Sequence, residues 1–411
     1  MNSLASIIKK NNLIIIIISV CFIIRLVFVF VNDIKTLPLG DAKGYYTIAE
    51  NIAAGNGYTK NGLDHTATRA PFLPYLLSLA FVLPGSSLVY AKMIIILLST
   101  LVCYIIYLTG KEVFNKKTGI IASIIWSLYL PAIYYSGFIL TEIPGALFLS
   151  LSILFLLKHY QFPSYKNKIF IGIFLILLTY SRSIFLLLPI VVCFWLLLIS
   201  HKSLKQGISD SLWIIILFAM FALPWTLRNF SVFNSFIPVT TRVGFSLLQG
   251  NHEISTGIHT YDYGNFNIII KPKYKNDLLN EAEQDNRYKT AAIKNIRNEP
   301  WKFTKRMGIK FFELWKVVSP RTTTRNNLLS TISYGFVLVT AVIGLILSYR
   351  KYWEKILLLI LVLAYISLIH MVFFALVRYR FPVEPILIIL SAYTISKTIR
   401  WNFQNTVDSN R

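Results

Sequence analysis

The chain has 411 residues, of which 55% are hydrophobic and only 14% are charged. Soluble domains average about 25% charged residues, so this composition, with a mean hydropathy of +0.60, is typical of a polytopic membrane protein. Lys and Arg number 41 against 18 Asp and Glu, and the net charge of +23 suits a membrane surface and anionic substrates. The basic residues lie mostly in loops between apolar runs, which argues against nucleic acid as a partner. Cys21, Cys103 and Cys193 each fall inside an apolar run, which argues against a disulfide framework or a metal cluster.

The first apolar run, Leu13 to Val31, is about long enough to span a bilayer. A signal peptide would have a shorter apolar core followed by a small-residue cleavage site, so we predict a retained helix with a cytoplasmic N-terminus. Further apolar runs are Leu88–Leu108, Thr118–Tyr135, Glu142–Leu157, Ile169–Tyr180, Ile184–Ile199, Ile208–Trp225, Leu328–Leu347, Ile356–Leu376 and Val383–Ile395.

Pro71 to Leu83 is also apolar, but it is short and bracketed by prolines. Short Lys/Arg-rich loops belong on the cytoplasmic face, and all five such loops share one face only if this segment does not cross. Those loops are Lys111–Lys117, Lys158–Lys168, His201–Lys205, Tyr349–Lys355 and Lys397–Arg411. We therefore predict an all-α membrane protein with about ten to eleven transmembrane helices.

The same parity divides the chain into four parts. We predict an N-terminal transmembrane catalytic module over residues 1–226, which includes a first outside loop at 32–87 with interfacial helices. An extracytoplasmic domain at 227–327 follows, then C-terminal transmembrane helices at 328–398 and a cytoplasmic tail at 399–411. Within that domain, Asp277–Asn298 is expected to form a polar helix. Pro300–Val317 interleaves aromatic and basic residues as an interfacial helix does.

Asp41 opens a helical pattern in the first outside loop, in which Tyr45, Ile48, Ala49 and Ile52 recur on one face and Gly55 follows as a helix C-cap does. Its carboxylate is a candidate general base or electrostatic partner, and the alternative is a helix N-cap. Arg69 closes the same loop just before Pro71. A guanidinium there can grip a phosphate, and the alternative is an interface anchor.

Glu142 lies at the outer end of two apolar runs, where an ionisable group is a functional candidate, although it also suits a helix start. Arg182 interrupts two other runs and is a second candidate for a phosphate. Arg378 and Arg380, in RYRFPVEP, are further candidates, and an internal salt bridge with Glu384 is the competing interpretation.

His65, His252 and His259 are all predicted outside, but no HExxH, CxxC or close His pair is present, so we predict no metal or other cofactor. Walker A, GxGxxG and GxSxG motifs are also missing from the sequence, which disfavours nucleotide binding and a serine nucleophile.

The order of these motifs resembles the glycosyltransferase C superfamily over nearly the whole chain. GDAKGYYTIAENIAAGNGY is followed by TRAPFLPYLL, FILTEIPGALF, TYSRSIFLLLP, ALPWTLRNF, GFSLLQGNHEISTG, NEPWKF and RYRFPVEPILIILSAY. The resemblance is strongest to bacterial members of the branch of protein mannosyltransferases and lipid A aminoarabinose transferases. The mannosyltransferases have an Asp-Glu pair in the first loop, whereas this chain has Asp41-Ala42.

The resemblance implies a multi-pass cell-membrane enzyme that transfers a sugar, with inversion, from a polyprenyl-phosphate donor on the extracytoplasmic face. Asp41 and Glu142 match the acidic positions of the family. Arg69 matches its phosphate contact, and Arg182, Arg378 and Arg380 match less securely. The acceptor is a lipid, a glycan or a protein hydroxyl. Two alternatives remain open: a transporter or flippase of a lipid-linked sugar, and a ligase or polymerase of preassembled glycans.

Overall fold

The computed structural model describes residues 2–32, 40–199, 203–258, 264–276, 278–317 and 331–398, with side chains from residue 13 onward. Among these residues the chain is built from helices, and the only extended pairing is an isolated bridge between Thr59 and His65. The α-helices of the first half are α1 (Asn2–Val31), α2 (Asp41–Ala53), α3 (Phe72–Ser78), α4 (Ser87–Val113), α5 (Lys116–Leu128), α6 (Leu130–Tyr135), α7 (Glu142–Gln161), α8 (Tyr165–Ser181) and α9 (Leu188–Leu198). Those of the second half are α10 (Leu204–Phe233), α11 (Val243–Asn251), α13 (Lys271–Tyr274), α14 (Glu281–Asn298), α15 (Pro300–Trp315), α17 (Phe336–Ser348), α18 (Trp353–Val372) and α19 (Glu384–Thr398).

Short non-α turns join several of these helices. The 3-10 turns are η1 (Leu79–Phe81), η2 (Ser183–Phe185) and η5 (Val377–Val383), and the π-turns are η3 (Phe266–Ile270) and η4 (Thr331–Gly335). The 3-10 turns contain or precede prolines, which cannot donate an intrahelical hydrogen bond.

Six helices in the described part of the chain are long and apolar enough to cross a membrane: Leu13–Val31, Ser87–Val113, Glu142–Gln161, Leu204–Phe233, Thr331–Ser348 and Trp353–Val372. This confirms the predicted all-α membrane fold. The predicted total of ten to eleven spans also counts the shorter helices α5, α8, α9 and α19, and that total stays a prediction. The Phe72–Phe81 helix is about 15 Å long at 1.5 Å per residue, well short of a bilayer core, as the prediction for Pro71–Leu83 requires.

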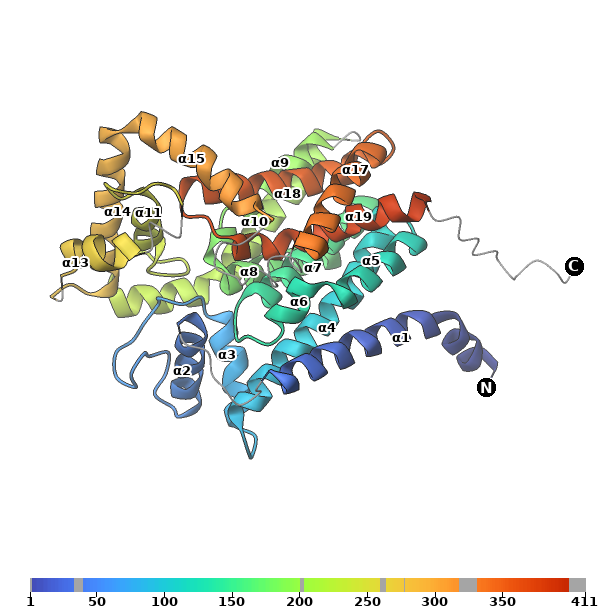
Figure 1. Ribbon diagram of the computed structural model, residues 1–411, viewed down its shortest axis with the longest axis horizontal. Helices are drawn as coiled ribbons and strands as arrows, with labels where there is room; N and C mark the ends of the chain where they lie inside the picture. The colour runs from blue at the N-terminus through green and yellow to red at the C-terminus, as the bar shows by residue number, and fades with distance from the viewer. Residues whose placement is uncertain are drawn as a thin grey trace, which may run out of the picture.

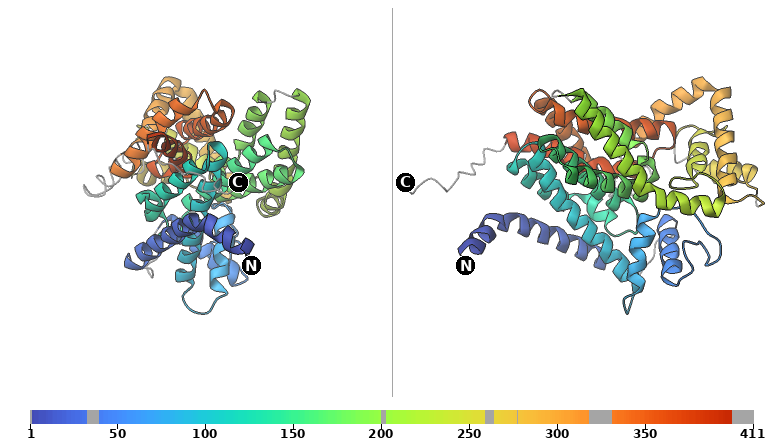
Figure 2. Two further views of the ribbon diagram at one scale, coloured as in Figure 1. Left: turned by 90° about the vertical axis from the view of Figure 1, so that its right-hand side faces the viewer. Right: turned by 180° about the vertical axis from the view of Figure 1, so that it is seen from behind.

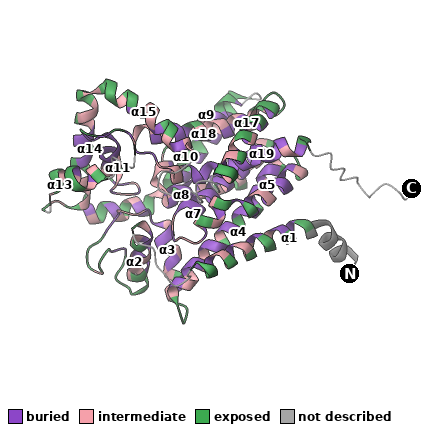
Figure 3. Cartoon of the chain, viewed as in Figure 1, coloured by how far each residue is buried: buried purple, intermediate pink, exposed green. Residues whose placement is uncertain are grey.

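The helices form an elongated bundle with different structures at its two ends (Figure 1). The start of α1 and the end of α19 lie at one end, and α2, α11, α13, α14 and α15 gather at the other, as the view from behind also shows (Figure 2). Of the six long helices, α7 is the most buried, with its neighbours packed around it (Figure 3). The outward faces of α1, α10 and α17 carry exposed apolar side chains, as a lipid-facing surface does.

Arg25 is buried in the last third of α1, and its hydrogen bonds connect α1 to α4 and α5. Its guanidinium donates to Ser99 Oγ on α4 at 2.6 Å and to the Trp126 carbonyl of α5 at 3.0 Å. A charge at membrane depth is expensive unless its hydrogen-bonding groups are satisfied, so these bonds explain how an arginine is accommodated in the first span.

Helices predicted from local sequence signals begin and end close to the expected residues. α2 buries Tyr45, Ile48 and Ala49, and Gly55 follows it with φ +81°. The predicted polar helix from Asp277 begins at Glu281, because Asn280 forms a capping box with Glu283. α10 continues to Phe233, so the helix extends beyond residue 227, where the extracytoplasmic domain was predicted to begin.

The close packing of α17 against α19 predicts that a larger side chain at Gly344 destabilises the protein. A Cβ at Gly344 of α17 would lie 2.1 Å from the Leu390 carbonyl oxygen of α19, so Gly344→Ala should force the two helices apart and lower the melting temperature. Gly308→Ala is the matched control, because a Cβ there would have no atom within 4 Å and alanine favours the helix. Equal melting temperatures for the two variants in detergent would contradict this packing.

Candidate functional site

Asp41 is the first residue of α2, and its carboxylate faces two arginines. The N-cap position is taken by Gly40, with φ +78°, and Asp41 makes no capping hydrogen bond, so the capping alternative is wrong. One carboxylate oxygen, Oδ1, lies 2.9 Å from Nη1 of Arg69. The other oxygen accepts a hydrogen bond from Nη2 of Arg378. The two arginines come from opposite ends of the sequence and meet at one acid.

Glu142 begins α7, and its side chain is only 3% exposed. Its Oε1 lies 3.1 Å from Nη1 of Arg182 and 3.8 Å from Nε of Arg378. Arg378 therefore lies between Asp41 and Glu142 and joins them. The second oxygen, Oε2, is buried and has no hydrogen-bond partner among the described residues, so it is available to accept a ligand hydroxyl.

Arg380 takes partners other than these acids. Its guanidinium lies 3.1 Å from Glu384 and donates to the carbonyl oxygens of Leu314 and Lys316, and it lies over the Tyr334 ring. Both charged side chains of the Arg380–Glu384 pair are buried. The internal salt bridge considered for RYRFPVEP is thus present for Arg380, and the structure does not bring this residue to Asp41 or Glu142. Its predicted phosphate role has no support in this arrangement.

A fourth guanidinium, that of Arg242, was not predicted to belong to the site. Arg242 immediately precedes α11, close enough to Asp41 and Arg69 for charge interactions with both, and its guanidinium lies 4.3 Å from the centroid of the Phe245 ring. Burial, followed by repulsion from Arg69, lowers its pKa, and Asp41 opposes that change. Among the described residues no carboxylate lies within ion-pair distance of it.

Two glycines allow the arginines to approach so closely. A Cβ at Gly44 would lie 3.2 Å from Nε of Arg69, and one at Gly145 would lie 3.0 Å from Cδ of Arg182. Either addition would push the guanidinium away from its acid. The close packing of Arg69 and Arg182 therefore explains why glycine occupies position 44 in GDAKG and position 145 in EIPG.

Aromatic rings lie against three of the guanidinium groups. The Arg69 guanidinium lies 5.1 Å from the centroid of the Tyr45 ring. The guanidiniums of Arg182 and Arg378 lie 5.3 and 5.4 Å from the centroid of Tyr379, whose ring stacks on His370. Each contact is a cation–π interaction that restricts the position of the charge.

The charges around Asp41 and Arg378 favour the ionised forms of these two groups. Burial alone would raise the pKa of Asp41, but the positive charges of Arg69 and Arg378 outweigh it and lower that pKa to about 2. Burial alone would likewise lower the pKa of Arg378, but Tyr379, Glu142 and Asp41 together raise it. Among the residues that the structure describes, four guanidinium groups then face two carboxylates, which leaves two positive charges without a carboxylate partner.

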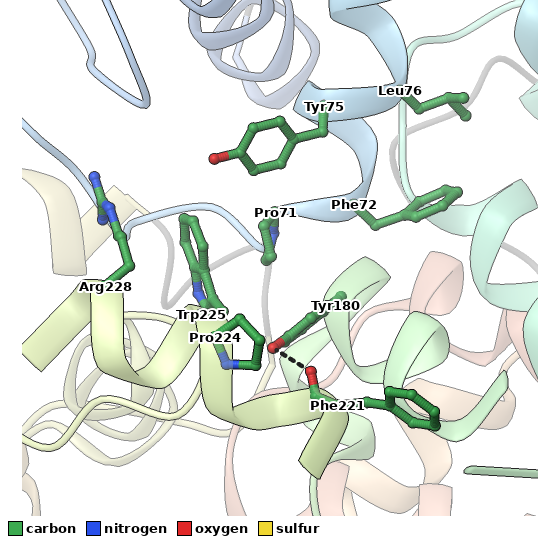
Figure 4. Close-up of a pocket in the computed structure, with 9 residues that line it drawn as sticks. All are labelled: Pro71, Phe72, Tyr75, Leu76, Tyr180, Phe221, Pro224, Trp225 and Arg228. Atoms are coloured by element: carbon green, nitrogen blue, oxygen red, sulfur yellow. Dashed lines mark hydrogen bonds between the residues drawn. The ribbon is translucent and has the colours of Figure 1, made fainter. Parts of the chain in front are cut away.

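A hollow of about 560 Å³ opens beside this cluster, between α3, α8 and α10 (Figure 4). Its lining is mainly apolar and includes Pro71, Phe72, Tyr180, Trp225 and, at one end, Arg228. Pro71 follows Arg69 by two residues, and Tyr180 precedes Arg182 by two, so the same two segments supply the hollow and the charged cluster. We refer to it below as the apolar groove.

The structure therefore brings Asp41, Glu142, Arg69, Arg182 and Arg378 together, adds Arg242 and leaves Arg380 elsewhere. Among the described residues, no group of three or more His, Cys, Asp or Glu side chains is placed to hold a metal ion. The one signal for Arg242 in the sequence is its position two residues before the glycine-containing stretch GFSLLQGN. Such glycines indicate a close approach of the backbone, but they do not indicate a role for the neighbouring charge.

Comparisons with known proteins agree with this architecture. Residues 68–225 match the family model described as dolichyl-phosphate-mannose-protein mannosyltransferase. The archaeal oligosaccharyltransferase AglB from Archaeoglobus fulgidus, solved with an inhibitory peptide and a dolichol-phosphate, superimposes with a TM-score of 0.61 at 16% identity. The alignment covers 95% of this chain and 50% of AglB, so the chain spans about half the length of that protein. The chain has the fold of the glycosyltransferase C superfamily.

Two other solved structures are also similar. The same archaeal enzyme tethered with an acceptor peptide containing the NVT sequon gives a TM-score of 0.59 at 17% identity, covering 95% of this chain and 50% of that one. ArnT from Cupriavidus metallidurans bound to undecaprenyl phosphate gives 0.44 at 11% identity, covering 94% of this chain and 78% of that one. No curated protein sequence matches the chain. The family-model match and the fold shared with AglB confirm the predicted resemblance to the glycosyltransferase C superfamily.

The lowered pKa of Asp41 predicts a pH-dependent contribution to stability in this glycosyltransferase C fold. A carboxyl group with a folded pKa of about 2 and an unfolded pKa of about 3.9 stabilises the fold above pH 4 and loses that effect as the pH falls towards 2. Asp41→Asn should therefore lower the melting temperature at pH 6, and the difference from wild type should shrink as the pH falls towards 2.

The matched control is Asp64→Asn, since Asp64 lies in the same loop at an exposed position. Melting curves across this pH range check the prediction. An Asp41→Asn difference that stays constant with pH would contradict the proposed ion pairs.

Proposed function

We propose that the chain is a membrane glycosyltransferase that moves a sugar from a polyprenyl-phosphate donor to an acceptor hydroxyl on the extracytoplasmic face. The observation that carries this proposal is the charge of the cluster. Four guanidiniums face two carboxylates beside an apolar groove, so a ligand that joins an anionic phosphate to a long hydrocarbon would satisfy both features.

The charge balance supports a monophosphate carrier. A sugar joined to a polyprenyl monophosphate carries one negative charge, and the phosphate that leaves after transfer carries up to two. Two uncompensated positive charges match that leaving group, and fixed charges at a developing anion are the largest common source of rate enhancement. We assign the phosphate to Arg69, Arg182 and Arg242, of which Arg242 has no carboxylate partner in the described part of the chain.

The apolar groove is suited to the first isoprene units of the carrier. Part of its lining is supplied by the residues that follow Arg69 and by Tyr180, which precedes Arg182, so a phosphate held by these arginines would direct its chain into the groove. The family-model match over residues 68–225 includes the whole groove apart from Arg228. AglB, which has the same fold, was solved with a dolichol-phosphate, and this supports a polyprenyl-type lipid as the ligand.

The transfer step needs one base and one leaving group. The acceptor oxygen attacks the anomeric carbon from the face opposite the phosphate, the bond from that carbon to the phosphate oxygen breaks, and its electron pair leaves with the phosphate. Asp41 takes the proton from the acceptor hydroxyl. Glu142 holds Arg182 through Oε1 and presents the unpartnered Oε2 to a sugar hydroxyl.

Asp41 is a poor base while both arginines hold it, because a carboxyl group with a pKa of about 2 accepts a proton weakly at neutral pH. The donor phosphate competes with Asp41 for the guanidinium of Arg69. Binding of the donor therefore draws positive charge away from Asp41, adds negative charge nearby and raises the pKa of the carboxyl group. The base becomes competent only when the donor is in place.

The first test of this function uses Asp41→Asn. The amide keeps the size of the side chain but cannot take a proton, so sugar release from a labelled polyprenyl-phosphate-sugar should fall by about 10²–10⁴-fold. The purified protein in detergent, assayed for free polyprenyl phosphate, provides the measurement, and Asp64→Asn serves as the control with unchanged activity. An Asp41→Asn enzyme as fast as wild type would reject Asp41 as the base. A wild-type protein that releases no sugar from any such donor would reject the function.

A second prediction concerns the pH dependence of the rate. The profile of kcat/KM reports the free enzyme and that of kcat reports the donor complex. We expect kcat to fall on the acid side with an apparent pKa near 4 or above, as for an Asp released from its arginines, whereas kcat/KM should decline only towards a pKa of about 2. Initial rates between pH 3 and 7 check this, and identical acid limbs in the two profiles would contradict donor-dependent release of Asp41.

A further inference from the structure

Arg242 lies between two points at which the chain is held by α14. Thr241 precedes it, and the first turn of α11 follows it with Gly244 and Phe245. Two carboxylates of α14, Glu281 and Asp285, bind these two flanks. They are four residues apart and so project from the same face of the helix.

Glu281 holds the flank before Arg242 and the segment that leads to Arg69. Its Oε2 accepts hydrogen bonds from Thr241 Oγ1 at 3.0 Å and from the Ala67 backbone N–H at 3.0 Å. Its Oε1 accepts one from Thr66 Oγ1 at 2.8 Å and pairs with Lys60. A single carboxylate thus fixes two segments that come together from distant parts of the sequence.

Asp285 holds the flank after Arg242. Its two oxygens accept the backbone N–H groups of Gly244 at 2.9 Å and Phe245 at 2.8 Å. These are unpaired donors at the start of α11, so Asp285 fills the role of a helix cap from a different helix. Burial raises the pKa of Asp285, and the N–H groups of Gly244 and Phe245 oppose that change.

The backbone itself is adapted to this contact. A Cβ at Gly244 would lie 1.9 Å from the Asp285 carbonyl oxygen, so α11 can approach α14 only with glycine at this position. At the other end of α11, a Cβ at Gly250 would lie 1.8 Å from the Phe373 carbonyl oxygen. The short helix is therefore held on both sides, and its start has little freedom to move.

We propose that Glu281 and Asp285 are positioning residues that hold the Arg242 guanidinium at the donor phosphate, with Glu281 also fixing the approach to Arg69. This inference rests on the proposed function. Neither carboxylate touches the donor. Each acts by limiting where Arg242 can go, so its loss should weaken binding of the phosphate more than it slows the chemical step.

The experiment compares Glu281→Gln and Asp285→Asn with Glu253→Gln. Glu253 is the control because it is an exposed carboxylate of the neighbouring segment whose partners are Lys273 and Tyr274. For the two test variants we expect KM for the donor, and Kd for polyprenyl phosphate, to rise roughly tenfold, the effect of losing one charge-assisted hydrogen bond. For Glu253→Gln both constants should equal those of wild type.

A double-mutant comparison separates positioning from general loosening of the fold. Arg242→Gln alone should raise Kd for polyprenyl phosphate, and adding Asp285→Asn should raise it little further, because Asp285 binds only the flank of Arg242 and acts through that residue. Thr241→Val removes the hydroxyl that donates a hydrogen bond to Glu281, whereas Thr241→Ser keeps that hydroxyl. The first should reproduce part of the Glu281→Gln effect and the second should bind as wild type does.

Several outcomes would overturn the inference. These are a Glu281→Gln enzyme with wild-type constants, an Asp285→Asn effect that adds fully to that of Arg242→Gln, or a change confined to kcat. Each of these outcomes presupposes a wild-type protein that releases sugar from the donor. They can therefore be told apart from failure of the proposed function, in which the wild-type protein itself is inactive. If Glu281→Gln does not fold, the Thr241→Val and Thr241→Ser pair decides the question.

Discussion

The structure of the site depends on the bridge that Arg378 makes between two acids. Asp41 begins α2, Glu142 begins α7, and Arg378 lies in the turn before α19, so three distant parts of the sequence meet at one guanidinium. The contact places a polar cluster against the ends of membrane-length helices, where an uncompensated charge is costly. Arg69 and Arg182 complete the pairing, and the glycines beside them allow the close approach.

The same network explains how the proposed glycosyltransferase would control the basicity of Asp41. In the free protein the carboxylate of Asp41 is held by Arg378 and by Arg69, and the proposed phosphate also needs Arg69. Under the proposed function, this arrangement would link donor binding to the release of Asp41. The α11–α15 region contributes to this arrangement, because it supplies Arg242 and holds it with two carboxylates of α14.

Much of this organisation follows from local sequence signals. The apolar runs predicted most of the membrane helices, and Gly55 and Asn280 are turn and cap residues near the observed helix ends. Asp41, Glu142, Arg69, Arg182 and Arg378 were predicted because each is a charge at an apolar boundary. Which of them meet could not be predicted, since that depends on packing between helices. Arg380 has the same local signal as Arg378, yet it pairs with Glu384, and Arg242 has no boundary signal at all.

The most direct test is a structure of the protein in a lipid nanodisc with polyprenyl phosphate bound. The account predicts a phosphate within about 3 Å of the guanidiniums of Arg69, Arg182 and Arg242, its chain in the groove lined by Phe72 and Trp225, and an Asp41–Arg69 separation longer than 2.9 Å. A phosphate bound elsewhere, with Asp41 still held by both Arg69 and Arg378, would contradict it.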